Sequence, residues 1–113
     1  MEECLFCKIA AGEIPSNTLF EDDRILAFYD IDPQAPVHFL VIPKQHIPSA
    51  AALTEENGPL LGHVFATISR LCKELGVENG YRVVSNVGQD GGQSVPHLHF
   101  HVLAKRSLAW PPG

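Results

Sequence analysis

The strongest hydrophobic pattern in the chain lies between residues 59 and 75, where apolar side chains recur at helical spacing. At about 100° per residue they fall within an arc of about 140°, and these residues are Leu60, Leu61, Val64, Phe65, Ile68, Leu71, Cys72 and Leu75. The pattern predicts one long amphipathic helix ended by Gly76, with its apolar face on a sheet and Cys72 in the core. His63 falls on the polar side and is predicted to be a solvated surface residue.

Short apolar runs separated by turn residues predict strands in the remainder of the chain. The runs are residues 18–20, 25–29, 37–42, 81–87 and 97–103. Asp22-Asp23 and Asp32-Pro33 form turns among the first three, which therefore predict an antiparallel meander. A short helix is expected over residues 3–11, ended by Gly12 and Pro15. Because the strands come in blocks, the fold class is α+β: a five-stranded antiparallel sheet with one long helix and a short N-terminal helix.

Composition bounds the domain organisation and the classes of partner. The 113 residues are 45% hydrophobic and 19% charged, which predicts a single domain over residues 1–113 with a real core. A net charge of −5 argues against binding to a nucleic-acid polymer, although backbone amides can still hold a small phosphorylated ligand. No apolar run approaches the roughly 20 residues of a membrane helix. Three cysteines and the acidic start Met1-Glu2-Glu3, unlike a signal peptide, predict a cytoplasmic protein.

The most informative stretch is a row of alternating histidines, His97, His99 and His101. On a strand they would share one solvent-facing side, while the apolar residues between them point toward the long helix. Neighbouring histidines would lie about 7 Å apart at Cα and the outer two about 13 Å, so one zinc ion with bonds of about 2 Å does not reach all three. The row therefore predicts a division of roles; the alternative interpretation is an exposed strand that merely happens to be rich in histidine.

A glycine-rich loop over residues 88–94 precedes this row. Gly88, Gly91 and Gly92 permit positive φ and close backbone approach, and successive N–H groups in such a turn can form an anion-binding nest. Ser94 adds a hydroxyl group. Such a loop alone is more often a plain turn, but beside the histidines it favours a phosphate held next to a nucleophilic or general-acid imidazole.

The alternation of histidine and apolar residues over residues 97–103 resembles the signature of the histidine triad (HIT) superfamily of nucleotide hydrolases and transferases. Further segments are similar to its Hint branch, and the resemblance covers nearly the whole chain. These segments are Phe20-Glu21-Asp22-Asp23-Arg24, Asp32-Pro33-Gln34-Ala35-Pro36, His38-Phe39-Leu40-Val41-Ile42-Pro43-Lys44, Gly91-Gly92-Gln93-Ser94-Val95 and Trp110-Pro111-Pro112-Gly113.

The resemblance implies a homodimeric purine nucleoside phosphoramidase that cleaves P–N bonds such as those of AMP-amine adducts. His99 would attack the α-phosphorus and form a nucleotidyl-histidine intermediate, and His101 would contact the phosphate. His38 would orient the histidines, and Ser94 would assist protonation of the leaving group. A neutral imidazole, with an ordinary pKa of about 6.5, suits the attacking role at pH 7.

The resemblance also implies contacts for a purine mononucleotide of the AMP or GMP type. The phosphate would meet Asn86, Gly92 and the backbone around Ser94 and Val95. Asp30 would bind the ribose hydroxyls, and a carboxylate is a suitable partner for a diol. Phe6, Phe28 and Ile31 would enclose the base. Read without the family, Asp30 is a turn residue and Phe28 an ordinary core residue.

Cys4 and Cys7 have a CxxC spacing, which chelates zinc when two further ligands are present. No βαβ pattern adjoins the pair, which disfavours a thioredoxin-like redox motif. In some members of the superfamily such a pair binds zinc with two histidines, which here would be His46 and His97. Many Hint-branch proteins lack the metal, so a structural zinc and a metal-free segment both stay open, and the chemical step needs no metal in either case.

Two other functions remain as alternatives. A dinucleoside polyphosphate hydrolase from another HIT branch would share the triad, although Ser94 and the terminal Trp110-Pro111-Pro112-Gly113 favour the Hint branch. A nucleotide-binding regulatory or scaffold protein would bind the same ligand with only incidental hydrolysis.

Overall fold

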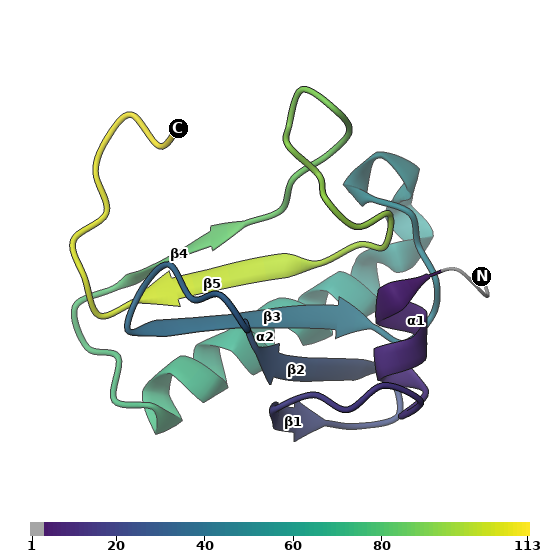
Figure 1. The fold of residues 1–113 in the computed structure, drawn as a ribbon, viewed down its shortest axis with the longest axis horizontal. Helices are drawn as coiled ribbons and strands as arrows, with labels where there is room; N and C mark the ends of the chain where they lie inside the picture. The colour runs from purple at the N-terminus through teal and green to yellow at the C-terminus, as the bar shows by residue number, and fades with distance from the viewer. Residues whose placement is uncertain (1–3) are drawn as a thin grey trace.

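The computed structural model describes residues 4–113, and a five-stranded antiparallel sheet forms its centre (Figure 1). Residue 3, the predicted first residue of the N-terminal helix, lies outside the described residues. The elements are α1 (Leu5–Ala10), β1 (Thr18–Glu21), β2 (Ile25–Tyr29), β3 (Val37–Pro43), η1 (Ala50–Ala52), η2 (Glu55–Asn57), α2 (Gly58–Glu74), β4 (Tyr81–Val84) and β5 (Phe100–Ala104). The predicted α+β fold class is confirmed.

The strands lie in the order β1-β2-β3-β5-β4, and every neighbouring pair is antiparallel. The meander of the first three strands is confirmed. β5 pairs with β3 and leaves β4 at the edge. In the β3–β5 register Leu40 lies opposite His101, so His38, two residues away, is a diagonal neighbour of His101 on the same face. This strand order therefore brings together two histidines that are 63 residues apart in the chain.

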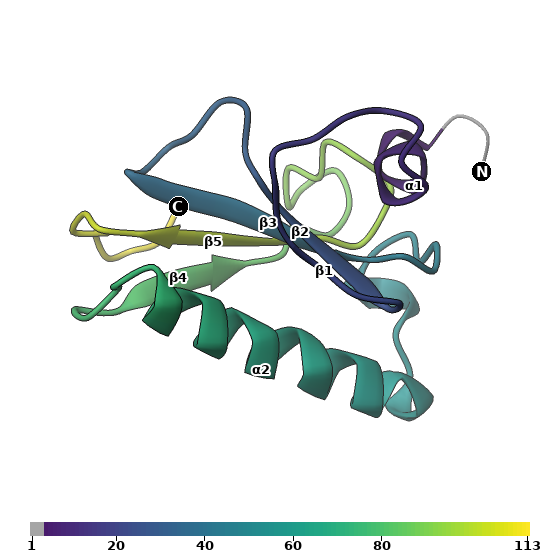
Figure 2. The ribbon, with the colours of Figure 1, turned by 90° about the horizontal axis from the view of Figure 1, so that it is seen from below.

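One face of the sheet packs against α2 (Figure 2). The buried helix residues of this core are Val64, Ile68, Leu71 and Cys72, and the buried sheet residues include Ile25, Phe39, Val41, Phe100 and Val102. Cys72 is a core residue, as its place in the apolar arc predicts. No helix in the described part of the chain is both long enough and apolar enough to span a bilayer.

The short helix α1 packs on the opposite face, so β2 and β3 are buried on both sides (Figure 2). A second, smaller core forms on this face between Cys4 and Phe6 of the α1 segment and four residues of β2 and β3. The four strand residues are Leu26, Phe28, Leu40 and Ile42. Burial on both faces explains why β2 and β3 read as continuous apolar runs rather than as alternating ones. The second core fixes α1 beside the histidines.

The last two strands are shorter than predicted. β4 ends at Val84 rather than at residue 87, and β5 begins at Phe100 rather than at residue 97. Leu98 donates its backbone N–H to the Ile47 carbonyl at 2.6 Å, and this bond joins it to the loop after β3 rather than to a strand. His97 and His99 therefore precede the strand.

His63 is not the solvated residue that its place on the helix predicts. Its Nε2 lies 2.6 Å from Oδ2 of Asp22, so it joins α2 to the turn between β1 and β2. Burial alone would raise the pKa of Asp22, but N–H groups of Ile25 and Arg24 and the partner His63 outweigh it and lower that pKa. The helical pattern does not show this pair because its partner comes from a distant turn.

Candidate functional site

The histidines of the row share one face, but they are not exposed. His97 and His99 are 0% and 3% exposed, and His101 is half-buried. Their face is covered by α1, whose Phe6 ring lies 5.0 Å from the ring of His99. The shared face agrees with the predicted alternation, whereas the predicted solvent exposure is wrong because the alternation does not show that a short helix packs there.

His99 has a defined hydrogen-bonding state. Its Nδ1 lies 2.7 Å from the backbone carbonyl oxygen of His97. A carbonyl only accepts hydrogen bonds, so Nδ1 carries the hydrogen and Nε2 of the neutral ring carries a free lone pair. The rings of Phe6 and His101 meet the His99 ring edge to face at 5.0 and 5.1 Å. This arrangement gives a fixed imidazole with one unprotonated nitrogen.

His38 and His101 form a second arrangement on β3 and β5. The backbone N–H of Gln34 donates to Nδ1 of His38 at 3.0 Å. Nδ1 is thus an acceptor, and Nε2 of His38 carries the hydrogen. That Nε2 lies 2.9 Å from Nδ1 of His101 and 3.4 Å from Oδ2 of Asp30. His38 therefore donates toward His101, with Asp30 as a second acceptor.

The same side chains of Asp30, His38 and His101 bring their ligand atoms within 4.8 Å of one another. A metal here would need a lone pair on Nε2 of His38, which is protonated while Gln34 donates to Nδ1. Burial lowers the pKa of His101, the nearby imidazoles of His99 and His38 lower it further, and Asp30 opposes them. The geometry therefore favours a hydrogen-bonded chain from Gln34 through His38 to His101 and Asp30 over a metal centre.

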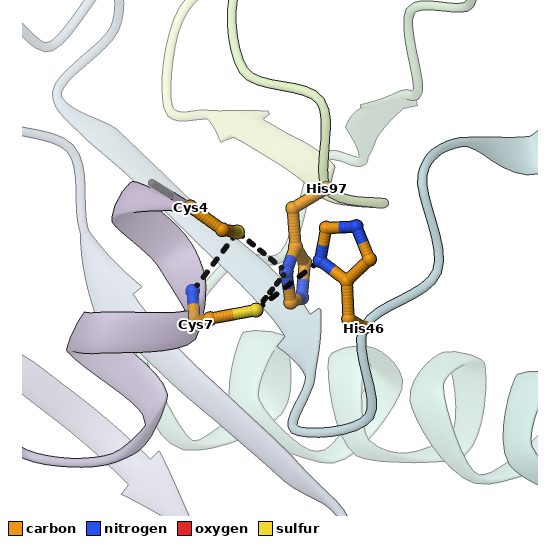
Figure 3. A group of neighbouring side chains, drawn as sticks. All are labelled: Cys4, Cys7, His46 and His97. Carbon is orange, nitrogen blue, oxygen red and sulfur yellow. Dashed lines mark hydrogen bonds between the residues drawn. The ribbon is translucent and has the colours of Figure 1, made fainter. Parts of the chain in front are cut away.

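Cys4, Cys7, His46 and His97 form the second cluster (Figure 3). Their four ligand atoms all lie within 4.8 Å of one another. Sγ of Cys4 is 3.3 Å from Nδ1 of His97, and Sγ of Cys7 is 3.1 Å from Nδ1 of His46 and 3.5 Å from that of His97. Ligand atoms of a tetrahedral zinc with bonds of about 2.0–2.3 Å are separated by about 3.3–3.8 Å. The four predicted ligands thus meet at a spacing that fits zinc.

The protonation of the ring of His97 suits this role. Its Nε2 lies 2.8 Å from the carbonyl oxygen of Pro43, so Nε2 carries the hydrogen and Nδ1 turns its lone pair to the thiols. Burial is the main cause that lowers the pKa of His97 and keeps it neutral. Burial and then Cys4 raise the pKa of Cys7 to about 11, so metal binding would release a proton from this thiol.

The predicted nucleotide contacts are brought together only in part. Phe6 and Phe28 are buried and meet edge to face at 5.7 Å, beside His99. Ile31 is 100% exposed and does not join them. Asp30 directs Oδ2 toward His38, and its Oδ1 accepts the N–H of Asp32 at 2.8 Å.

Several backbone N–H groups of the glycine-rich loop form hydrogen bonds within the loop itself. Gly92 donates its N–H to Gln89 at 3.0 Å, and the side chain of Gln93 binds the carbonyls of Pro48 and Val95 at 2.8 and 2.9 Å. The amide of Gly92 is therefore already engaged. Ser94 is exposed, whereas Asn86 and Val95 are half-buried.

Comparison with known proteins decides the family. The profile of the HIT domain matches residues 11–108. The chain belongs to the HIT family. It is 52% identical over 112 residues to an uncharacterized HIT-like protein of Synechococcus elongatus, covering 99% of this chain and 98% of the relative. An uncharacterized HIT-like protein of Synechocystis is 46% identical with the same coverage.

Solved structures of HIT proteins agree in fold. A HIT family hydrolase from Legionella pneumophila superposes with a TM-score of 0.96 and 49% identity, covering 98% of this chain and 100% of that one. A histidine triad protein from Clostridium difficile has a TM-score of 0.93 and 46% identity, covering 96% of each chain. The predicted superfamily is confirmed, and the Hint branch stays a prediction.

Sequence reasoning missed the residues that act on this HIT site through the backbone or from its edge. The N–H of Gln34 and the carbonyl of Pro43 orient His38 and His97. The hydroxyl of Ser85 donates to the carbonyl of His99 at 2.9 Å. Every residue carries backbone groups, so only their placement in space marks these as special.

A cavity of about 560 Å³ lies beyond the C-terminal end of β5, away from the histidines. None of the predicted site residues lines it, and its lining is Gly76, Val77, Glu78, Asn79, Gly80, Lys105, Arg106 and Ser107. It is therefore separate from the histidine site.

Proposed function

We propose that this HIT protein hydrolyses the P–N bond of purine nucleoside 5′-phosphoramidates through a nucleotidyl-histidine intermediate. The observation that carries the proposal is the bond from Nδ1 of His99 to the His97 carbonyl, which leaves the Nε2 lone pair free. Similarity to the HIT family hydrolase of Legionella pneumophila supports a hydrolase.

In the first step, the Nε2 lone pair of His99 attacks the α-phosphorus and forms a new P–N bond. The bond to the amine breaks, and the amine leaves with its electron pair and one proton, which Ser94 relays from solvent. The ring of His99 becomes cationic, and the His97 carbonyl that accepts from its Nδ1 stabilises that charge.

In the second step, water attacks the same phosphorus and the bond to Nε2 breaks. The electron pair returns to Nε2, one proton passes to solvent, and the nucleoside monophosphate leaves. His101, held by His38, contacts a phosphate oxygen through its Nε2. The proton that the attacking water releases equals the proton that the amine takes up, so the two steps together neither gain nor lose a proton.

The edge-to-face pair of Phe6 and Phe28 supports a wall for a purine base beside His99. Asp30 is proposed to bind the ribose hydroxyls through Oδ2, which requires it to leave its 3.4 Å contact with His38. Asn86, Gly92 and the backbone of Ser94 and Val95 are proposed to hold the phosphate.

A structural zinc is proposed at the CxxC cluster, where Cys4, Cys7, His46 and His97 would hold it. With these four ligands, zinc would cross-link the segments that carry them and would leave no position for a reacting water. The residues themselves then fix α1 to the segment before β5, which places Phe6 over His99.

A homodimer is also proposed. β4 is an edge strand, and Tyr81 on it is 43% exposed. An open strand edge of this kind pairs readily with a second copy. Sedimentation that shows only monomer at micromolar concentration would contradict the dimer.

The activity is tested by comparing the turnover of AMP phosphoramidate with that of diadenosine triphosphate. Faster turnover of the phosphoramidate is expected. A preference for diadenosine triphosphate would assign a dinucleoside polyphosphate hydrolase instead. Binding of AMP without turnover of either would assign a nucleotide-binding regulatory or scaffold protein.

A further inference from the structure

Gln34, in the loop between β2 and β3, is held from two sides. Its N–H donates to Nδ1 of His38 at 3.0 Å, and its carbonyl accepts a 2.8 Å hydrogen bond from Nε of Arg106. Arg106 also donates from Nη1 to the carbonyl of Ser107 at 3.1 Å. The guanidinium thus ties the segment after β5 to the residue that orients His38.

The strand register explains how Arg106 reaches this loop. Val37 at the start of β3 pairs with Ala104 at the end of β5, so the residues before Val37 run beside those after Ala104 (Figure 1). The loop's other bonds are local, such as the one from the side chain of Gln34 to the carbonyl of Asp32 at 2.9 Å. Arg106 therefore supplies a restraint on Gln34 from outside the loop.

The hydrogen bonds from Gln34 through His38 to His101 all donate in the same direction. A backbone N–H only donates, so His38 accepts at Nδ1 and donates from Nε2. The nearest acceptor is Nδ1 of His101 at 2.9 Å, which leaves the hydrogen of neutral His101 on its own Nε2. A reversed His38 would meet Gln34 with two opposing hydrogens and would turn a lone pair toward His101.

We propose that Arg106 is a positioning residue which, by holding Gln34, fixes the tautomers of His38 and His101 and keeps the Nε2 hydrogen of His101 available for the substrate phosphate. The consequence for turnover rests on the proposed phosphoramidase activity. The tautomers do not depend on that activity.

The tautomers can be read from long-range ¹H–¹⁵N correlation spectra of the histidine side chains. In the wild type, His38 and His101 are expected as single Nε2–H tautomers. Arg106→Ala should shift both toward mixed tautomers. Arg82→Ala is the matched control, because Arg82 likewise donates to a backbone carbonyl, that of Ala109 at 2.9 Å, away from the histidines.

Arg106→Lys keeps a cationic donor and should restore the wild-type tautomers at least in part. Arg106→Met, which keeps an apolar side chain without a donor, replaces Arg106→Ala if that variant does not fold. With phosphoramidate substrate, Arg106→Ala should lower kcat about threefold to tenfold and leave KM within about twofold, while Arg82→Ala changes neither.

Wild-type tautomers in Arg106→Ala, or in Arg106→Met where only that variant folds, would overturn the proposal. Equal mixing of tautomers in Arg82→Ala would overturn it as well, since the effect would then be general. A wild type without phosphoramidase turnover would defeat the proposed function alone, because the spectra still decide the role of Arg106.

Discussion

His97 and His99 are joined by a 2.7 Å hydrogen bond from the ring of His99 to the backbone of His97. Nδ1 in the ring of the same His97 lies 3.3 Å from Sγ of Cys4. One residue thus belongs to the candidate metal site through its side chain and orients the ring of His99 through its carbonyl. The two candidate sites therefore share His97, and the proposed mechanism routes no step through a metal.

Removing one thiol of the cluster should remove the metal. For Cys7→Ser we expect the zinc content of chain purified without chelator or histidine tag to fall from about one per chain to near zero, because three ligands remain. Cys72→Ala is the control, since Cys72 is a buried cysteine in the other core and should leave the zinc unchanged. Equal zinc in Cys7→Ser and the wild type would exclude the proposed ligand set.

Phe6 should matter far more for stability than an exposed phenylalanine. It is 6% exposed and packs against Phe28 and His99, so Phe6→Ala should lower the free energy of unfolding by about 3–5 kcal/mol. Phe65 is 47% exposed, and Phe65→Ala should cost about 1 kcal/mol. Urea denaturation measures both, and similar losses would mean that α1 is not a packed part of the fold.

The hydrogen bonds that Asp22 accepts from the N–H groups of Ile25 and Arg24, together with its contact to His63, should appear in the pH dependence of stability. The folded pKa of Asp22 is lowered from 3.8, so its ionised form stabilises the fold above that pH and the contribution disappears as the pH falls through the folded value. Asp22→Asn should thus be less stable than wild type near neutral pH, with the gap closing as the pH falls below 3.8 through the lowered folded pKa. Asp23→Asn, in the same turn and exposed, is the control. A gap that does not change with pH would show that ionisation of Asp22 is not the cause.

Most of the fold follows from side-chain periodicity. The bounds of β2 match the prediction, and those of α2 differ by one residue at each end, because each element buries a continuous apolar surface. The histidine row was predicted to continue the last strand, but Leu98 gives its N–H to Ile47. A pattern of alternating residues is the same whether or not a partner strand is present.

The sequence and its resemblance indicated which cysteines and histidines come together, but not the backbone groups that orient them. The cluster of Cys4, Cys7, His46 and His97 assembles as the family resemblance implies. The partners that set the tautomers are the N–H of Gln34 and the carbonyl of Pro43, which are backbone groups that leave no signal in the sequence. The family resemblance implied Ile31 at the base, and in the structure its side chain is 100% exposed.

Gln93 should control the order of the glycine-rich loop. Its side chain accepts from the N–H of Gly88 and donates to two carbonyls, so Gln93→Ala should speed amide exchange over residues 88–95. If the loop holds phosphate, KM should also rise about threefold to tenfold. Gln89→Ala, exposed in the same loop, is the control. Unchanged amide exchange in Gln93→Ala would show that this side chain does not hold the loop.

The central claim is that Nε2 of His99 becomes covalently bonded to the nucleotide. Rapid acid-free quench of the wild type with AMP phosphoramidate, followed by peptide mass spectrometry, should find an acid-labile adenylyl group on His99. His99→Ala should lose the adduct and at least about a thousandfold in turnover while still binding AMP, and His63→Gln, a histidine outside the site, should keep both. Turnover at the wild-type rate in His99→Ala, or an adduct on another residue, would contradict the account and favour direct attack by water.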